Sequence, residues 1–231
     1  MREIVFDTET TGLDPYQGHR LVEIGCIEII NRFATGEVFH RYINPEREMP
    51  AEAEAVHGLT AAFLRDKPVF AEIAVELMEF IGDAPLVAHN AVFDLGFLNA
   101  ELERVRHPPV PRDRLIDTLI LARRKYPGSP NRLDDLCNRF DIDLSRRTRH
   151  GALLDAELLA EVYLELIGTR QAQLGLVAAI EPRFAAIGKA PRVRPVPLAP
   201  RITDADRRAH RVLVATLGTA AIWNEYISAA A

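Results

Sequence analysis

The chain has 231 residues, 48% hydrophobic and 26% charged, a composition typical of a globular protein with one sizeable core. Its formal net charge of −5 argues against a protein that holds nucleic acid mainly through a basic surface, although cations bound to clustered acids would invert the local charge. The two cysteines, Cys26 and Cys137, lie far apart and show no metal-ligand spacing, so neither a disulfide framework nor a zinc site is predicted.

Strands dominate the first part of the chain. Short apolar or alternating runs predict three of them, at residues 4–6, 21–29 and 37–43. The short connection that contains Asn31 and Gly36 favours antiparallel pairing of the second and third strands. Apolar residues spaced i, i+3 and i+4 then predict an amphipathic helix over 70–81, and a buried strand follows at 86–88.

Helices and short strands alternate up to residue 169. We expect a strand at 115–116, with Asn131 as an N-cap and Gly168 as a helix end, and helices at 93–105, 119–125, 132–140 and 152–167. Three strands followed by alternating helices and strands predict an α/β domain with a mixed sheet over residues 1–169.

The composition changes in residues 170–231. Prolines and arginines alternate over 191–201, which predicts an extended tether of polyproline character. Short helical patterns lie on either side, at 174–187 and 203–217, with Trp223 and Tyr226 after the second. This tail has too little apolar mass to fold alone, so we expect it to order on a partner.

No export or membrane signal is visible. Glu76 and Glu79 interrupt the most apolar stretch, 73–81, far short of the roughly 20 residues that a membrane span needs. The N-terminus runs straight into the strand at 4–6, without the regions of a signal peptide. We expect a soluble, cytoplasmic protein.

Two acids follow the first buried run. Asp7 and Glu9 are two residues apart at the end of a strand, so both carboxylates point to one face of the sheet. The surrounding segment 7–13 contains no basic residue, and uncompensated carboxylates in such a place favour a bound cation. The alternative is a pair of ordinary surface acids.

Two further acids and a histidine complete the set. Asp94 begins a helix, where it could simply complement the helix dipole. Asp155 lies among leucines in the last helix of the domain, so it is either at the rim or buried with a partner such as a metal. His150 would not share a helical face with Asp155, but from a loop, with Gly151 giving backbone freedom, its ring can turn over the site. The alternative for His150 is a solvated loop residue.

In this order the residues resemble the DEDD exonucleases with a histidine base, whose motifs are Asp-x-Glu, a central Asp and His-x-x-x-x-Asp. The resemblance covers about residues 2–168 and implies a ribonuclease H-like fold. Within this group the chain resembles the proofreading (epsilon) subunits of bacterial DNA polymerase III, through segments at 10–12, 52–53, 56–58, 89–90 and 131–136.

The resemblance also implies an activity and its residues. It implies two-metal hydrolysis of mismatched 3′-terminal nucleotides, with two divalent cations, Mg²⁺ or Mn²⁺, as cofactors. The implied metal ligands are Asp7, Glu9, Asp94 and Asp155, which with the base His150 make the catalytic set.

Contacts to the terminal nucleotide are implied in the same way. They come from Glu52 and His57, besides Asp7, Glu9 and Asp155, while Leu13 and Phe93 pack against the terminal bases. The alternative for His57 is that His-Gly ends a helix over 51–56. We assign Asp117 and Asp134 to helix starts.

The implied partners are a single-stranded 3′ end of DNA, the polymerase III catalytic subunit, bound through the tail, and the sliding clamp, bound through Gln171–Leu176. The clamp-like segment is equally readable as a polar helix start. Two other functions stay open: a stand-alone exoribonuclease or repair exonuclease of the same superfamily, and a non-catalytic scaffold of a polymerase assembly.

Overall fold

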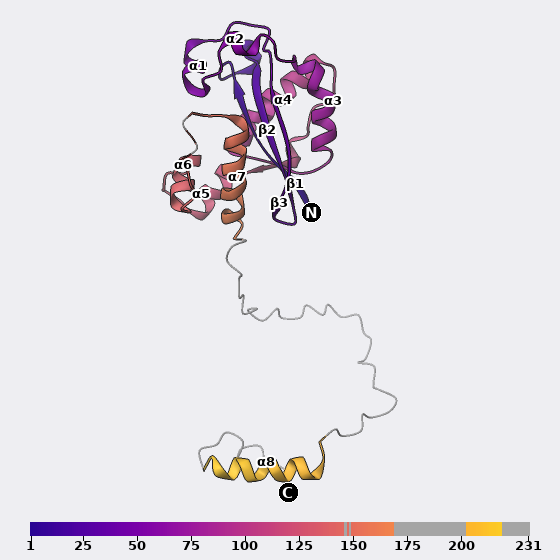
Figure 1. The fold of residues 1–231 in the computed structure, drawn as a ribbon, viewed down its shortest axis with the longest axis vertical. Coiled ribbons are helices and arrows are strands. Elements are labelled where there is room, and N and C mark those ends of the chain that lie inside the picture. Colours follow the sequence, from indigo (N-terminus) through magenta and orange to yellow (C-terminus); the bar gives the residue numbers. More distant parts are fainter. Residues whose placement is uncertain (146, 148, 169–201, 219–231) are drawn as a thin grey trace. The chain divides into compact units, whose positions relative to one another are not determined.

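The computed structural model describes residues 1–145, 147, 149–168 and 202–218 (Figure 1). The chain divides into two units, Met1–Gly175 and Leu176–Ala231, which are treated separately. The elements of the first unit are β1 (Arg2–Thr10), β2 (Leu21–Ile30), β3 (Phe33–Tyr42), α1 (Ala51–His57), α2 (Ala61–Leu64), α3 (Phe70–Ile81), β4 (Leu86–Ala88), α4 (Ala91–Arg104), β5 (Leu115–Asp117), α5 (Thr118–Lys125), α6 (Leu133–Arg139) and α7 (Ala152–Leu166), with short 3₁₀ turns at Pro15–Gln17 and Arg112–Arg114.

The five strands form one mixed sheet in the order β3-β2-β1-β4-β5. β1, β2 and β3 pair antiparallel, whereas β4 pairs parallel with β1 and β5 parallel with β4. The expected mixed sheet is therefore confirmed, and β1 lies at its centre.

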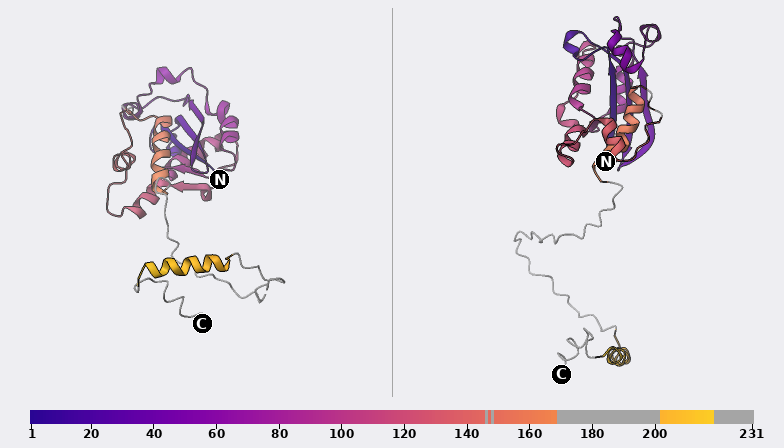
Figure 2. Two further views of the ribbon diagram at one scale, coloured as in Figure 1. Left: turned by 60° about the horizontal axis from the view of Figure 1, so that its bottom comes forward. Right: turned by 90° about the vertical axis from the view of Figure 1, so that its left-hand side faces the viewer.

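Alternate residues of β1 serve two different cores. Ile4 and Phe6 face a large cluster with residues of α3 and α4, whereas Val5 faces a cluster with Leu159 and Tyr163 of α7. Helices thus cover both faces of the sheet (Figure 2). Because side chains alternate along a strand, the odd-numbered residues of β1 are directed toward α7.

Several predicted elements have different bounds. β1 extends to Thr10, beyond the expected 4–6, so Asp7 and Glu9 lie within the last four residues of the strand. β3 begins at Phe33 instead of 37, because the two-residue turn consists of Asn31, as expected, and Arg32, both with positive φ, whereas Gly36 lies within β3. The helices at 70–81 and 152–166, the strand at 86–88 and the end of α7 before Gly168 agree with expectation.

The N-cap of α6 was predicted wrongly. Arg132 occupies that position, and its own side chain makes no cap hydrogen bond, whereas its backbone N–H donates to Asp135 Oδ2 at 2.9 Å. Asn131 instead fixes the preceding loop, because its Nδ2 donates to the carbonyls of Ser129 at 2.8 Å and Tyr126 at 3.3 Å.

The described part of the second unit is α8 (Asp204–Thr216), which agrees with the helical pattern expected at 203–217. Thr203 caps it by accepting a hydrogen bond from the backbone N–H of Asp206. The predicted boundary at residue 169, the clamp-like Gln171–Leu176, the Pro-rich segment and Trp223 lie outside the described residues and stay predictions. Among the described helices none has the length and apolar character of a membrane span.

Candidate active site

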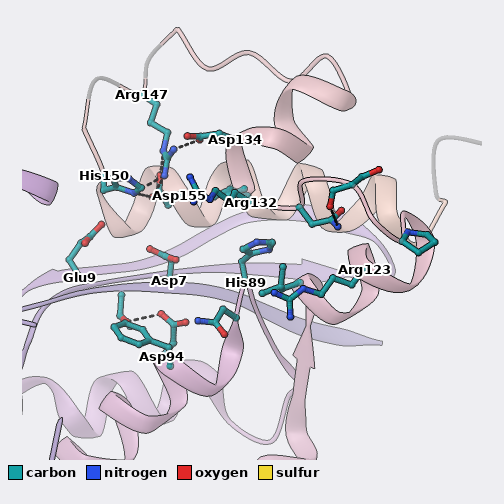
Figure 3. Close-up of a pocket in the computed structure, with 18 of the residues that line it drawn as sticks. Asp7, Glu9, His89, Asp94, Arg123, Arg132, Asp134, Arg147, His150 and Asp155 are labelled. Atoms are coloured by element: carbon teal, nitrogen blue, oxygen red, sulfur yellow. Dashed lines mark hydrogen bonds and ion pairs between the residues drawn. The ribbon is translucent and has the colours of Figure 1, made fainter. Parts of the chain in front are cut away.

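Asp7 and Glu9 lie on the α7 face of β1, two residues apart, as the alternation predicts. Val5, Asp7 and Glu9 are alternate residues on the same face of β1. The apolar core contact of Val5 therefore gives way to two carboxylates toward the end of the strand. Asp7 is half-buried and Glu9 is buried. Figure 3 shows both carboxylates beside Asp155 of α7.

Asp94 reaches the site from the opposite face of the sheet. It lies in the first turn of α4 and is buried, and its Oδ1 accepts a hydrogen bond from Thr8 Oγ1 at 2.7 Å. Thr8 stands between Asp7 and Glu9 on β1, so one strand holds all three acids in register. Asp94 therefore lines the same cavity, in addition to its favourable place in the first turn of the helix.

Asp155 depends on close packing of α7 against β2. Gly25 pairs with Asp7 across the two strands. A Cβ at Gly25 would lie 2.5 Å from the backbone nitrogen of Leu153, so only glycine allows the first turn of α7 to approach this closely. This approach places buried Asp155 over the acids of β1.

His150 lies in the loop before α7, and its ring turns back over the helix as expected. Its Nδ1 is 3.0 Å from Asp155 Oδ2, and the side chain is 49% exposed at the rim. The expected backbone freedom of Gly151 is not used, since its φ of −161° is extended backbone open to any residue.

Arg147 supplies a positive charge that the sequence analysis missed. Its Nε lies 2.6 Å from Asp155 Oδ1 and its Nη2 lies 2.7 Å from Asp155 Oδ2. Nη1 also contacts Asp134 at the start of α6. In the sequence, only the position of Arg147 three residues before His150 pointed to the site. Its pairing with Asp155 and Asp134 becomes visible only in the folded chain.

The single positive charge of Arg147 does not neutralise all four carboxylates of the site. Burial, with repulsion from Asp94, Asp155 and Glu9, raises the pKa of Asp7 well above its ordinary value. Burial and the neighbouring carboxylates raise the pKa of Glu9 to about 8, and burial raises that of Asp94 to about 7. Burial also acts to raise the pKa of Asp155, but hydrogen bonds from His150 and Arg147 outweigh it and hold the pKa below its ordinary value.

The donor set fits divalent cations. Oxygen or nitrogen atoms of Glu9, His150 and Asp155 lie within 4.8 Å of one another, a group able to hold a metal ion. Half-buried Asp7 and buried Asp94 add further carboxylate oxygens to the same cavity. Buried acids with raised pKa values gain from a bound cation, and a carboxylate-rich set suits a hard ion.

Two cavities meet at these acids. The first, of about 1030 Å³, contains the acids and continues past His89 to α5 and α6. The second, of about 600 Å³, contains the predicted substrate residues Glu52, His57, Leu13 and Phe93. Both are bordered by Thr8, Glu9 and Phe93.

His57 both ends α1 and lines the second cavity. Gly58 follows it with φ 76°, so the helix-end interpretation is correct as far as it goes. The backbone N–H of Leu59 donates to His57 Nδ1 at 3.0 Å, and burial lowers the pKa of the ring. The neutral ring therefore carries its proton on buried Nε2. The backbone of Thr10 acts to raise the pKa of the ring, but in the described structure Nε2 completes no well-aligned hydrogen bond.

The two remaining acids are accounted for by structure. Asp117 is the N-cap of α5 and accepts from the backbone N–H groups of Leu119 and Ile120, as predicted. Asp134 lies in the first turn of α6, as expected, and additionally pairs with Arg147.

The chain is similar to known proteins along most of its length. Residues 4–163 match the model of the RNase_T family, described as Exonuclease. The DNA polymerase III subunit epsilon of Rickettsia conorii is 55% identical over 180 residues, covering 77% of this chain and 78% of that protein. The same subunit of Escherichia coli is 49% identical over 175 residues, 72% of each chain.

Solved structures show the same architecture. A structure of exonuclease X in complex with 5′ overhanging duplex DNA has a TM-score of 0.56 at 27% identity and covers 72% of this chain and 91% of that one. A structure of exonuclease I has a TM-score of 0.65 at 22% identity, covering 74% of this chain and 41% of that one, which shows the fold alone. The family match covers more than half of the chain, and these relatives favour the proofreading function over the exoribonuclease, repair and scaffold alternatives. The chain belongs to the exonuclease family and, within it, to the 3′→5′ proofreading epsilon subunits of DNA polymerase III.

Proposed function

We propose that the acids around Asp7 hydrolyse the terminal phosphodiester of a DNA 3′ end with the help of two divalent cations, and that His150 is the general base. The observation that carries the proposal is the meeting of Asp7, Glu9, Asp94 and Asp155 in one cavity. Buried carboxylates that repel one another are stabilised by cations, and a phosphodiester can then approach an otherwise acidic site.

The cations would be Mg²⁺ or Mn²⁺, because most of the donors are carboxylate oxygens. Asp7 and Asp155 would hold one ion, Asp7 and Glu9 the other, and Asp94 would act partly through water. When bound, the two ions supply an activated water and neutralise charge that develops on the phosphate and on the leaving 3′-oxygen.

His150 would move a proton at the rim of the cavity. If its Nδ1–H donates to Asp155 Oδ2, which is 3.0 Å away, then Nε2 keeps a free lone pair. Nε2 would take the proton from the attacking water, a role for which imidazole suits neutral pH.

The second cavity would receive the terminal nucleotide. Leu13, 84% exposed in the absence of a ligand, and Phe93 offer apolar contact to a base. Nε2–H of His57 is a buried donor that would gain a partner on the nucleotide. Glu52 on α1 borders the same cavity. Such a site stacks bases and reads little sequence, so fraying of a mismatched end would give selectivity.

The names of the relatives support DNA as the substrate and a polymerase as the partner. We assign polymerase binding to the tail, residues 170–231, which includes α8. Binding of a sliding clamp by Gln171–Leu176 belongs to the same proposal.

The test is digestion of 5′-labelled single-stranded DNA and of its RNA counterpart, with Mg²⁺, Mn²⁺ or EDTA. The expected result is a metal-dependent ladder that shortens from the 3′ end of DNA and is weaker on RNA. Asp7→Ala should abolish the ladder, whereas Asp83→Asn, the loss of an exposed acid that lines neither cavity, should leave it intact. Preference for RNA, or a ladder that survives Asp7→Ala, would contradict the proposal.

A further inference from the structure

We propose that Arg123 and Arg132 form a binding site for phosphates of the DNA strand on the 5′ side of the scissile bond. We call these two residues the basic wall. The proposal rests on the exonuclease function above and adds the path along which the strand leaves the carboxylates.

The basic wall lies in the part of the first cavity beyond the acids. Arg123 comes from α5 and Arg132 precedes α6, and both line this cavity. In Figure 3, Glu9 and His150 appear at one end of the view and Arg123 at the other, with His89 and Arg132 between them. A cavity of about 1030 Å³ that extends this far has room for more than the scissile phosphate.

The orientation of α5 directs Arg123 into the cavity and its neighbour Arg124 away from it. Leu119 and Arg123 are four residues apart, hence on one face of the helix, and both line the cavity. Arg124 is turned about 100° further round the helix and does not line it. Exposed Arg124 thus provides a matched control for the loss of one charge from the same helix.

Within the described residues, the positive charges of the basic wall are not neutralised by acidic side chains. Neither Arg123 nor Arg132 forms an ion pair there, whereas Asp134, the acid of this part of the cavity, is paired with Arg147. Both arginine side chains belong to exposed residues. A guanidinium presents a planar set of N–H donors that matches a phosphate, so a phosphodiester anion is the ligand that this chemistry favours.

The backbone under the basic wall is held in place. His89 Nδ1 lies 2.9 Å from Thr118 Oγ1, which joins the end of β4 to the start of α5. Asn131 donates to two carbonyls of the loop between α5 and α6, and Arg139 Nη2 donates to Pro130 O at 3.1 Å. A fixed backbone lowers the entropic cost of ordering the two arginines on a strand.

The direction of the strand follows from the difference between the two cavities. The second cavity, with Leu13, Phe93 and the Nε2 donor of His57, suits a single terminal nucleotide. It meets the first cavity at Glu9, beside the acids. A strand whose last nucleotide fills the second cavity therefore continues into the first, toward the basic wall.

The experiment compares two substrates of the full chain. One is single-stranded DNA of about 20 nucleotides. The other is the p-nitrophenyl ester of thymidine 5′-monophosphate, which has a terminal nucleotide and a cleavable phosphate but no upstream strand. In Arg123→Gln/Arg132→Gln, the ratio of kcat/KM on DNA to kcat/KM on the ester should fall about tenfold, mainly through KM on DNA. In Arg124→Gln the ratio should stay within about twofold.

The salt dependence is a second measurement. For single strands, log kcat/KM should change with log salt by about 0.7 per phosphate contact, so the double variant should lose about 1.4 from the slope on DNA. An unchanged ratio and slope, or an equal fall in Arg124→Gln, would overturn the basic wall. Failure of the wild-type chain to cleave the ester in Mn²⁺ would instead count against the proposed function, and equal melting temperatures would show that the variants are folded.

Discussion

The guanidinium of Arg147 contacts both carboxylate oxygens of Asp155, at 2.6 Å from Nε to Oδ1 and 2.7 Å from Nη2 to Oδ2. Arg147 thus occupies the oxygens with which Asp155 would bind a cation in the proposed site. Nη2 also lies 2.7 Å from His150 Nδ1, and a guanidinium can only donate there. Nδ1 cannot accept from Arg147 and at the same time donate to Asp155 Oδ2, so Arg147 in this position competes with the tautomer in which Nε2 is free to act as the base.

Replacing Arg147 should therefore change metal binding. At pH 9, above the raised pKa values of Glu9 and Asp94, we expect Arg147→Gln to bind Mn²⁺ about tenfold more tightly, because the competing charge is gone. In EDTA the same variant should melt at a lower temperature, since its acids lose their neutralising partner. Calorimetric titration and thermal melts measure the two effects, with Arg124→Gln as the control. Weaker Mn²⁺ binding in Arg147→Gln would contradict this role.

The variant His150→Ala distinguishes whether His150 acts as a general base or as a metal ligand. As a general base, His150 contributes about 10²- to 10⁴-fold to turnover and little to metal affinity. Single-turnover cleavage and calorimetric titration with Mn²⁺ measure the two separately. Since Glu9, His150 and Asp155 also form a group able to hold an ion, equal losses in turnover and affinity would instead identify His150 as a ligand.

The raised pKa values of the site acids should make the metal-free protein less stable as the pH rises from about 5 to 8. His57 and His89, whose pKa values burial lowers, act in the opposite direction at the lower end of this range. In the folded chain Glu9 has a pKa of about 8 and Asp94 of about 7, whereas both ionise near pH 4 when unfolded. Over this range the folded state binds more protons, so raising the pH favours unfolding. Asp155, with its lowered pKa, is ionised in both states and adds no slope.

Melting temperatures in EDTA at several pH values test this expectation. Added Mn²⁺ should raise the melting temperature more at pH 8 than at pH 6, because fewer protons then compete with the ion. The slope in EDTA should be smaller in Asp94→Asn, which has no proton to lose. The same slope in Asp94→Asn and in the wild-type chain would show that the pKa of Asp94 is not raised.

Gly25→Ala should damage stability and catalysis together. Its Cβ would lie 2.5 Å from the backbone of Leu153, so β2 or α7 must move, at a cost of about 1–3 kcal/mol. Such a shift displaces Asp155 and should lower kcat. Gly96→Ala is the control: it lies in α4 with no atom within 4 Å of an added Cβ, and alanine there should be neutral or stabilising. Denaturant unfolding and cleavage assays distinguish the two variants.

His57→Ala should raise KM for DNA with little effect on metal affinity, because a buried donor to the nucleotide is lost. A loss of about 5- to 30-fold is expected for one such hydrogen bond. His57→Gln, whose side-chain amide also donates, should recover part of it. Equal KM values for wild type and His57→Ala would place the nucleotide elsewhere.

The sequence was most informative where a local pattern determines structure. The apolar spacing over Phe70–Ile81 and the buried run at Leu86–Ala88 set those elements to the residue. The alternation of a strand placed Asp7 and Glu9 on one face before any fold was known. These features depend on neighbours within one element, which a sequence displays.

What could not be predicted depends on contacts between distant segments. Arg147 is near Asp155 in sequence, but its pairing with Asp134 requires α6 and α7 to pack together. The close approach of Leu153 to Gly25 depends on how α7 packs on the sheet, which the sequence does not display. Asn131 was taken for a helix cap because its side chain suits that position, whereas the fold uses it to close a loop.

The position of α7 in the chain has a consequence for synthesis on the ribosome. Asp7 and Glu9 are made first, but Asp155 belongs to α7, the last element described in the first unit, and His150 directly precedes it. A nascent chain that has formed β1 to β5 holds its acids without their partners. On the proposed mechanism, nuclease activity would not precede the emergence of α7 from the exit tunnel, and a message truncated before Asp155 would yield no exonuclease.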